Sequence, residues 1–197
     1  MQANPLDATA NTTGHSPMTI RFTRCFAMPN AETFSIRPIS EFVRRYLAES
    51  SISVDPFARN RDWATHTNDI DRNTTAQAHM DAEEFLIYLA KRGTVADLVL
   101  FDPPYSPRQV SEHYKAAGRE VTAEDTQNGR LYRRVRDAID RIMRPGGVVL
   151  SFGWQSMGMG LKRGYLPLEI LLVPHGGGHN DTICFAERKV LGSQTSC

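Results

Sequence analysis

Asp102, Pro103, Pro104 and Tyr105 form the stretch of the chain whose residue types and order are best suited to chemistry. They follow the continuous apolar run 98–101, which predicts a strand that is buried on both faces. Two prolines cannot donate to a sheet ladder, so they end that strand. In an open α/β sheet, ligands bind beyond the carboxyl ends of the strands, so we expect Asp102 and Tyr105 at the rim of a cleft. The alternative is a strand that ends in a Pro-Pro turn with Asp102 as its cap.

Three helices are expected around this stretch. An apolar stripe over 39–47 predicts a helix with Pro38 in its first turn. A second helix is expected to begin at Asp81, a natural N-cap residue, and to end at Gly93. A third apolar stripe, over 131–142, predicts a helix that leads into a Pro-Gly-Gly turn.

Further strands are expected to position the candidate site. The segments 51–58 and 64–71 each predict a strand that ends in polar or acidic residues. A buried strand is expected over 148–152, directly after the Pro-Gly-Gly turn. Near the end of the sequence, the apolar runs 168–173 and 182–187 are joined by a glycine-rich loop, and we expect them to pair antiparallel.

The composition fits one soluble globular domain. The chain has 197 residues, of which 41% are hydrophobic and 23% charged, and its formal net charge is +1. No apolar run reaches membrane-spanning length, and the N-terminus lacks a secretory signal. Three cysteines without CxxC spacing argue against a disulfide framework or a zinc site and fit the cytoplasm. We expect residues 1–17 to be a disordered leader and 18–197 to be the single domain.

The Asp102–Tyr105 stretch resembles motif IV of the amino-methyltransferases, which methylate exocyclic amines of nucleobases from S-adenosylmethionine. The Asp-Pro-Pro-Tyr form is typical of the adenine-N6 DNA enzymes. The resemblance implies that the Asp102 carboxylate and the Pro103 carbonyl accept the two hydrogens of the amine, which makes its nitrogen more nucleophilic. It also implies that Tyr105 stacks on the base, which must be flipped out of the duplex to reach the methyl donor. Pro104 completes the motif.

Other segments resemble the cofactor-binding motifs of the same family. The segment 34–38 lies where motif X contacts the methionine part of the cofactor, and 55–58 resembles motif I, with Arg59-Asn60-Arg61 in place of its glycines. Asn60 is the residue best able to adopt the left-handed turn that those glycines allow. The cofactor-binding residues that the resemblance implies are Phe34, Ile36, Pro38, Asp55, Pro56, Phe57, Ala58, Asn60, Asp69, Asp81 and Asp102.

Two of these acids have alternatives. An acid at the end of the second strand commonly binds ribose hydroxyls, and we expect Asp69 to take this role, with Asp71 as its near competitor. Asp81 lies where a motif III acid binds the cofactor adenine, and it can cap its helix, with Glu84 as a capping-box partner, at the same time.

The basic residues between 106 and 144 are the expected contacts to nucleic acid, because phosphates need cations near the cleft. The candidates are Arg108, Lys115, Arg119, Arg130 and Arg133. For any single arginine, a solvated helix face is the alternative. A metal site is not expected. Residues 93–95 leave no room for a separate target-recognition domain, so the chain resembles a small phage- or prophage-type member, and a homodimer or a protein partner is left open as the source of specificity.

The order of these segments predicts an α/β fold of the Rossmann-like class I methyltransferase type. We expect a three-layer αβα arrangement with a mostly parallel seven-stranded sheet and an antiparallel last strand. The implied function is S-adenosylmethionine-dependent methylation of the N6 amine of adenine in DNA. The alternatives are a catalytically weak or inactive relative that binds nucleic acid or a partner, and the same chemistry on RNA adenine or cytosine N4.

Overall fold

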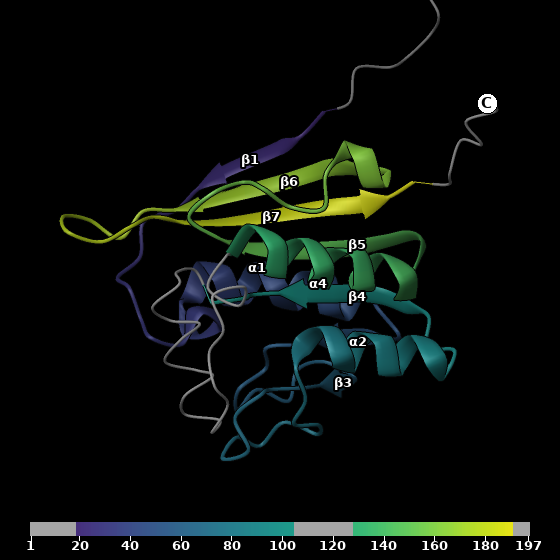
Figure 1. Cartoon of the computed structure of the whole chain (residues 1–197). Helices are drawn as coiled ribbons and strands as arrows, with labels where there is room; N and C mark the ends of the chain where they lie inside the picture. Colours follow the sequence, from purple (N-terminus) through teal and green to yellow (C-terminus); the bar gives the residue numbers. More distant parts are fainter. Residues whose placement is uncertain (1–18, 105–127, 191–197) are drawn as a thin grey trace, which may run out of the picture.

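A seven-stranded sheet forms the centre of the protein, whose computed structural model describes residues 19–104 and 128–190. The strand order is β1-β6-β7-β5-β4-β2-β3 (Figure 1). The strands are β1 Arg21–Arg24, β2 Ser53–Asp55, β3 His66–Thr67, β4 Ala96–Phe101, β5 Met143–Gly153, β6 Tyr165–Val173 and β7 Thr182–Lys189. Neighbouring strands run parallel, except that β7 is antiparallel to both β5 and β6. The expected sheet and its antiparallel last strand are confirmed.

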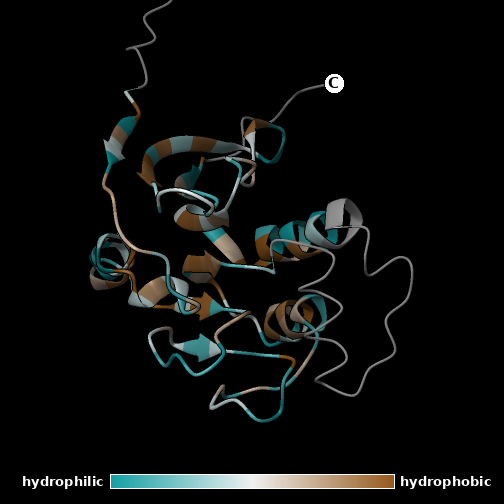
Figure 2. Ribbon diagram, turned by 90° about the vertical axis from the view of Figure 1, so that its left-hand side faces the viewer, coloured by the Kyte–Doolittle hydropathy of each residue, from teal (hydrophilic) through white to brown (hydrophobic). Residues whose placement is uncertain are grey.

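Helices cover both faces of this sheet. They are α1 Arg37–Ala48, α2 Ala82–Lys91 and α4 Asn128–Ile142, with short 3-10 turns η1 Thr33–Ser35 and η2 Leu161–Arg163. The α2 and α4 helices lie in front of the sheet in Figure 1 and α1 lies behind it. Figure 2 shows the same three layers from the side, with apolar residues concentrated in the central strands. The expected αβα arrangement is confirmed.

The two sheet faces carry separate hydrophobic clusters. On one face, Leu86 of α2 and Ile139 of α4 are fully buried with Val99 of β4. On the other face, Phe42 of α1 packs with Phe152 of β5, at 6.5 Å between ring centroids. Burial of this apolar area on both faces is what holds the strands at fixed positions relative to one another. Within the ranges 19–104 and 128–190, no helix is both long and apolar enough to span a bilayer.

The helix boundaries follow the local signals in the sequence. Pro38 lies in the first turn of α1, where its missing N–H costs nothing. The Asp81 carboxylate accepts a hydrogen bond of 2.9 Å from the Glu83 backbone N–H, which makes Asp81 the N-cap of α2. Gly93, with a φ of +75°, follows this helix in the left-handed region, as expected of a helix terminator.

The β1 strand was not expected from the sequence, and two other strands are shorter than expected. β1 pairs parallel with β6 at the outer edge of the sheet, and all four of its residues are exposed. A strand held by backbone hydrogen bonds alone has no buried face, so its sequence shows no alternation. The expected strands 51–58 and 64–71 contain only the short β2 and β3. A turn begins directly after β2, and after β3 only Asn68 pairs further, in an isolated bridge with Ala78. The expected leader, 1–17, lies outside the described residues.

Candidate functional site

The site lies where the strand order reverses. From β2 the chain continues to β3 on one side, and it later forms β4 on the other side of β2 and β5 beyond it. Such a switch point leaves a crevice at the carboxyl ends of the two flanking strands, and this is where open α/β sheets bind ligands. Asp55 is the last residue of β2, and Asp102 follows the last residue of β4. The fold therefore brings together two acids that the sequence separates by 47 positions.

An arginine lies between these two acids. The Arg61 Nη2 atom is 3.5 Å from Asp55 Oδ2 and 3.8 Å from Asp102 Oδ2. The same nitrogen donates a hydrogen bond of 2.9 Å to the Phe57 carbonyl oxygen, and the guanidinium lies 4.1 Å from the centre of the Phe34 ring. Only 10% of the Arg61 side chain is exposed, compared with 1% for Asp55 and 9% for Asp102. The crevice thus holds a largely enclosed cation between the buried Asp55 carboxylate and the half-buried Asp102 carboxylate.

Burial dominates the electrostatics of Asp55. It raises the pKa of this carboxyl to about 6, against the opposing effect of the Arg61 guanidinium. The Phe57 backbone N–H donates a hydrogen bond of 3.0 Å to Asp55 Oδ1. Asp55 Oδ2 and Arg61 Nε are buried and have no hydrogen-bond partner among the described residues. A buried carboxylate that faces a cation but lacks a full set of donors can accept further hydrogen bonds from a ligand.

The turn after β2 differs from its expected conformation. Arg59, not Asn60, adopts the left-handed conformation, with a φ of +53°. Its backbone N–H donates a hydrogen bond of 3.0 Å to Asp69 Oδ2, while Asp69 Oδ1 accepts one from the Asp71 N–H. The carboxylate of Asp69 therefore holds the turn in place, and this tertiary hydrogen bond selects Arg59 over Asn60. Asn60 instead accepts a hydrogen bond from the Thr75 N–H.

Asn68 is a buried residue at this turn that the sequence reasoning missed. Its side-chain amide donates to the carbonyl oxygens of Pro56 and Met80, and its Oδ1 atom accepts from the Met80 N–H. This amide ties the turn after β2 to the residue before Asp81. A local signal existed, since Asn68 lies between a strand and two acids, but its partners are 12 residues away in both directions.

The implied cofactor residues fall into two groups. Phe34, Asp55, Phe57 and Asp102 all take part in the contacts around Arg61 or flank them. Ile36 is buried next to α1, and Asp81 caps α2. Pro38, Pro56, Ala58, Asn60 and Asp69 take no part in the contacts with Arg61 given above. The roles of all eleven residues toward a cofactor stay predictions.

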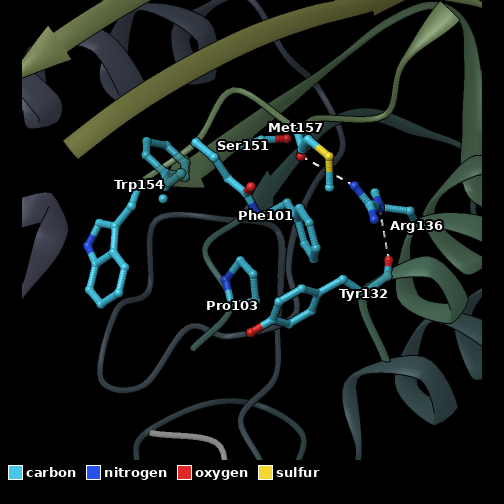
Figure 3. A pocket seen from close by; sticks show the side chains of 10 residues that line it. Phe101, Pro103, Tyr132, Arg136, Ser151, Trp154 and Met157 are labelled. Carbon is cyan, nitrogen blue, oxygen red and sulfur yellow. Dashed lines mark hydrogen bonds between the residues drawn. The ribbon is translucent and has the colours of Figure 1, made fainter. Parts of the chain in front are cut away.

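A cavity of about 360 Å³ lies over the ends of β4 and β5 (Figure 3). Phe101 and Ser151 are paired across these strands and form part of its wall. Tyr132 and Arg136 reach it from α4, and Pro103 adds to its lining. Phe152 and Gly153 at the end of β5 also line it, and the segment after β5 contributes Trp154, Gln155 and Met157. The sequence reasoning missed this cavity, because its residues come from three distant segments.

Two charged side chains fix the loop beside this cavity. Glu187 of β7 accepts hydrogen bonds from the Met159 and Gly160 N–H groups at 2.5 and 2.9 Å. Arg136 donates to the Met157 and Gly158 carbonyl oxygens at 3.3 and 2.9 Å. A Cβ atom at Gly158 would lie 1.7 Å from a Glu187 oxygen, so only glycine fits there. The loop conformation is therefore set before any ligand arrives.

Much of the expected substrate machinery lies outside the described residues. This holds for Tyr105, Arg108, Lys115 and Arg119 and for the side chain of Arg130. Arg133 is described, with 77% of its side chain exposed, and it lies 4.0 Å from Asp137. Across 19–104 and 128–190, no group of three or more His, Cys, Asp or Glu side chains is arranged to hold a metal ion.

Solved structures with a similar fold are methyltransferases. SMU.776, which is assigned as a methyltransferase and was crystallised with SAH, matches with a TM-score of 0.53 and 13% identity over 76% of this chain. TrmN from Thermus thermophilus matches with a TM-score of 0.51 and 15% identity over 79% of this chain. The N-methyltransferase NodS from Bradyrhizobium japonicum matches with a TM-score of 0.53 and 10% identity over 83% of this chain and all of its own.

The chain has the Rossmann-like fold of the class I methyltransferases. At these identities the likeness shows a shared fold and leaves the reaction to be argued from the site. The chain spans about half the length of SMU.776 and TrmN, at 49% of each. No protein-family model and no curated protein match the sequence.

Proposed function

We propose that this protein is an S-adenosylmethionine-dependent methyltransferase that acts on the N6 amine of adenine in DNA. The observation that carries the proposal is the position of Asp102. It begins the Asp-Pro-Pro-Tyr stretch, lies at the switch point of a methyltransferase-type sheet, and shares one cation with Asp55. That NodS, which has the same fold, is an N-methyltransferase supports a nitrogen atom as the acceptor.

The charges of the crevice fit the proposed cofactor. When bound, S-adenosylmethionine supplies an electrophilic methyl group on a positively charged sulfur, and its methionine part carries an ammonium group. The carboxylates of Asp55 and Asp102 provide the opposite charge, and the aromatic face of Phe34 can contact a cation as it does Arg61. The Arg61 guanidinium lies between these groups, so it has to move for the cofactor to use them.

Residues 102–105 would activate and hold the methyl acceptor. The Asp102 carboxylate and the Pro103 carbonyl accept the two hydrogens of the amine, which draws its lone pair out of conjugation with the ring. The nitrogen then forms the new bond to the methyl carbon as the sulfur–carbon bond breaks with its electrons going to sulfur. The methylated nitrogen, now positively charged, then gives a proton to the Asp102 carboxylate that already accepts this hydrogen, because an aromatic amine is too weak an acid to ionise first. Tyr105 holds the flipped base by stacking.

Arg61 favours a second candidate function. A guanidinium that neutralises both acids makes a stable crevice without any cofactor, as in a relative that has lost catalysis and binds nucleic acid or a partner protein. The two functions differ in whether S-adenosylmethionine displaces Arg61.

Transfer of a labelled methyl group tests the proposal. The protein is incubated with isotopically labelled S-adenosylmethionine and with DNA or RNA, and the digested nucleosides are separated by mass spectrometry. We expect label in N6-methyldeoxyadenosine, lost in Asp102→Ala and kept in Asp62→Ala, which removes an exposed acid beside the crevice. Label in RNA adenine or in cytosine would correct the substrate. Cofactor binding without label in any nucleic acid would contradict a nucleobase acceptor, and absence of binding would favour the second candidate.

A further inference from the structure

Ser151 is a buried polar residue in the wall of the cavity. It is 6% exposed, it lines the cavity, and its Oγ atom has no hydrogen-bond partner among the described residues. A buried hydroxyl without a partner destabilises the folded state, because it has lost water and gained nothing. A hydroxyl that borders an open cavity can recover this loss from a ligand.

The walls around Ser151 favour a flat aromatic ligand. Phe101 and Tyr132 meet edge to face, with 6.3 Å between their ring centroids and an angle of 85°. Trp154 stands at the cavity mouth with 46% of its surface exposed, and in Figure 3 its ring and that of Tyr132 lie on either side of Pro103. An exposed aromatic ring at the rim of a cavity is a surface on which planar rings stack.

The cavity is also in the right place for the methyl acceptor. The Asp102 carboxylate forms an ion pair with Arg61 in the crevice, and the next residue, Pro103, lines the cavity. A ring inside the cavity would therefore lie against Pro103, whose carbonyl oxygen is one of the two proposed acceptors for the amine hydrogens. The loop that carries Trp154 needs no rearrangement first, because Glu187 and Arg136 already fix its far end.

We propose that this cavity binds the heterocyclic ring of the methyl acceptor, with Trp154 as a stacking surface and the Ser151 hydroxyl as a hydrogen-bond partner for the ring edge. This inference rests on the proposed function for the identity of the ring as adenine. The assignment of Ser151 and Trp154 goes further, because it names which side chains select the ring and can be tested without cofactor.

The effect of Ser151→Ala on stability separates ligand recognition from a structural role. If Ser151 only supported the fold, its replacement would lower the melting temperature. Because its hydroxyl lacks a partner, we expect Ser151→Ala to raise the melting temperature by about 2–4 °C. The matched control is Ser156→Ala, at an exposed serine of the same segment that does not line the cavity.

Binding is measured with a labelled, short single-stranded dT oligonucleotide that carries one dA, by fluorescence anisotropy and without cofactor. An otherwise identical strand with an abasic site replaces the dA as the reference. We expect Ser151→Ala to weaken binding of the dA strand about fivefold and Trp154→Ala about tenfold, with Ser156→Ala unchanged. In Trp63→Phe protein, Trp154 is the remaining tryptophan, so its emission should be quenched by the dA strand and not by the abasic strand.

Equal affinity for the dA and abasic strands would overturn the inference, as would Ser151→Ala binding like Ser156→Ala. A drop in melting temperature with unchanged affinity would assign Ser151 to the fold instead. Failure of the proposed function is a separate result. It would appear as absence of methyl transfer in the labelling experiment, whether or not the dA strand binds through Ser151.

Discussion

Replacing Arg61 with alanine tests whether this side chain occupies the cofactor crevice. The change removes three ion pairs, with Asp55 at 3.5 Å and with Asp102 and Glu32 at 3.8 Å each. It also removes a hydrogen bond to the Phe57 carbonyl and a contact with the Phe34 ring. Removing one partner of a buried charge pair typically costs about 3–5 kcal/mol of unfolding free energy. Asp55 limits this cost, because without Arg61 its pKa rises above about 6 and the carboxyl can take up a proton. We therefore expect a loss of about 2–4 kcal/mol at pH 7, and a smaller loss at pH 5.

The same substitution should improve cofactor binding. In the wild-type protein, S-adenosylmethionine has to break the contacts of Arg61 before it can use the two carboxylates. In Arg61→Ala these carboxylates have no internal cation, so we expect the dissociation constant for S-adenosylmethionine to fall roughly tenfold. Urea unfolding measures the stability change and titration calorimetry measures the affinity. Arg44→Ala is the control, because Arg44 also lies over an aromatic ring, at 4.2 Å from Trp63, but on the exposed surface.

Two results would refute this reasoning. The first is a stability loss in Arg61→Ala no larger than that in Arg44→Ala, which would mean that the buried ion pairs contribute little. The second is weaker cofactor binding by folded Arg61→Ala, which would make Arg61 a ligand of the cofactor and not a substitute for it.

The other predictions concern catalysis, pH and backbone strain. Asp102→Ala should reduce methyl transfer by ~10²–10³ in a label-transfer assay, by analogy with the loss of one preorganised hydrogen-bonding group from an oxyanion hole. Calorimetry should show S-adenosylmethionine binding largely intact, because Asp55 still provides a carboxylate to the cofactor. Tyr105→Phe should be nearly silent in that assay, whereas Tyr105→Ala should weaken binding of the acceptor by about 1–3 kcal/mol. Burial raises the pKa of Asp55 from 3.8 to about 6, so its contribution to the free energy of unfolding is fully present below pH 3.8 and is lost as pH rises through about 6. Urea unfolding of the wild type and of Asp55→Asn from pH 4 to 7 should show this loss in the wild type alone. Arg59→Gly should be about 1 kcal/mol more stable than Arg59→Ala in urea, because both lose the ion pair with Glu32 and only glycine relieves the φ of +53°.

The parts of the fold that the sequence predicted well have local causes. Asp81 and Gly93 mark the ends of α2 because a capping side chain and a left-handed glycine act within one turn of the helix. The run before Asp102 predicted β4 because both faces of this strand are covered. The β6–β7 pair followed from two apolar runs joined by a loop too short for a crossover.

The parts that could not be predicted depend on tertiary contacts. Arg61 looked only like a bulky replacement for glycine, because its partners Phe34 and Asp102 come from other parts of the sheet edge. Ser151 is one polar residue in an apolar strand, and only the adjoining cavity indicates that its hydroxyl could bind a ligand. β1 has no buried face, so no periodicity marks it.

Modified-base sequencing of genomic DNA tests the central claim most directly. Cells that produce the wild-type protein are compared with cells that produce Asp102→Ala at the same level. We predict N6-methyladenine at a defined set of sites in the first DNA and background levels at the same sites in the second. If the level of N6-methyladenine were the same in both samples at every adenine, the assignment of this protein as a DNA adenine methyltransferase would be contradicted.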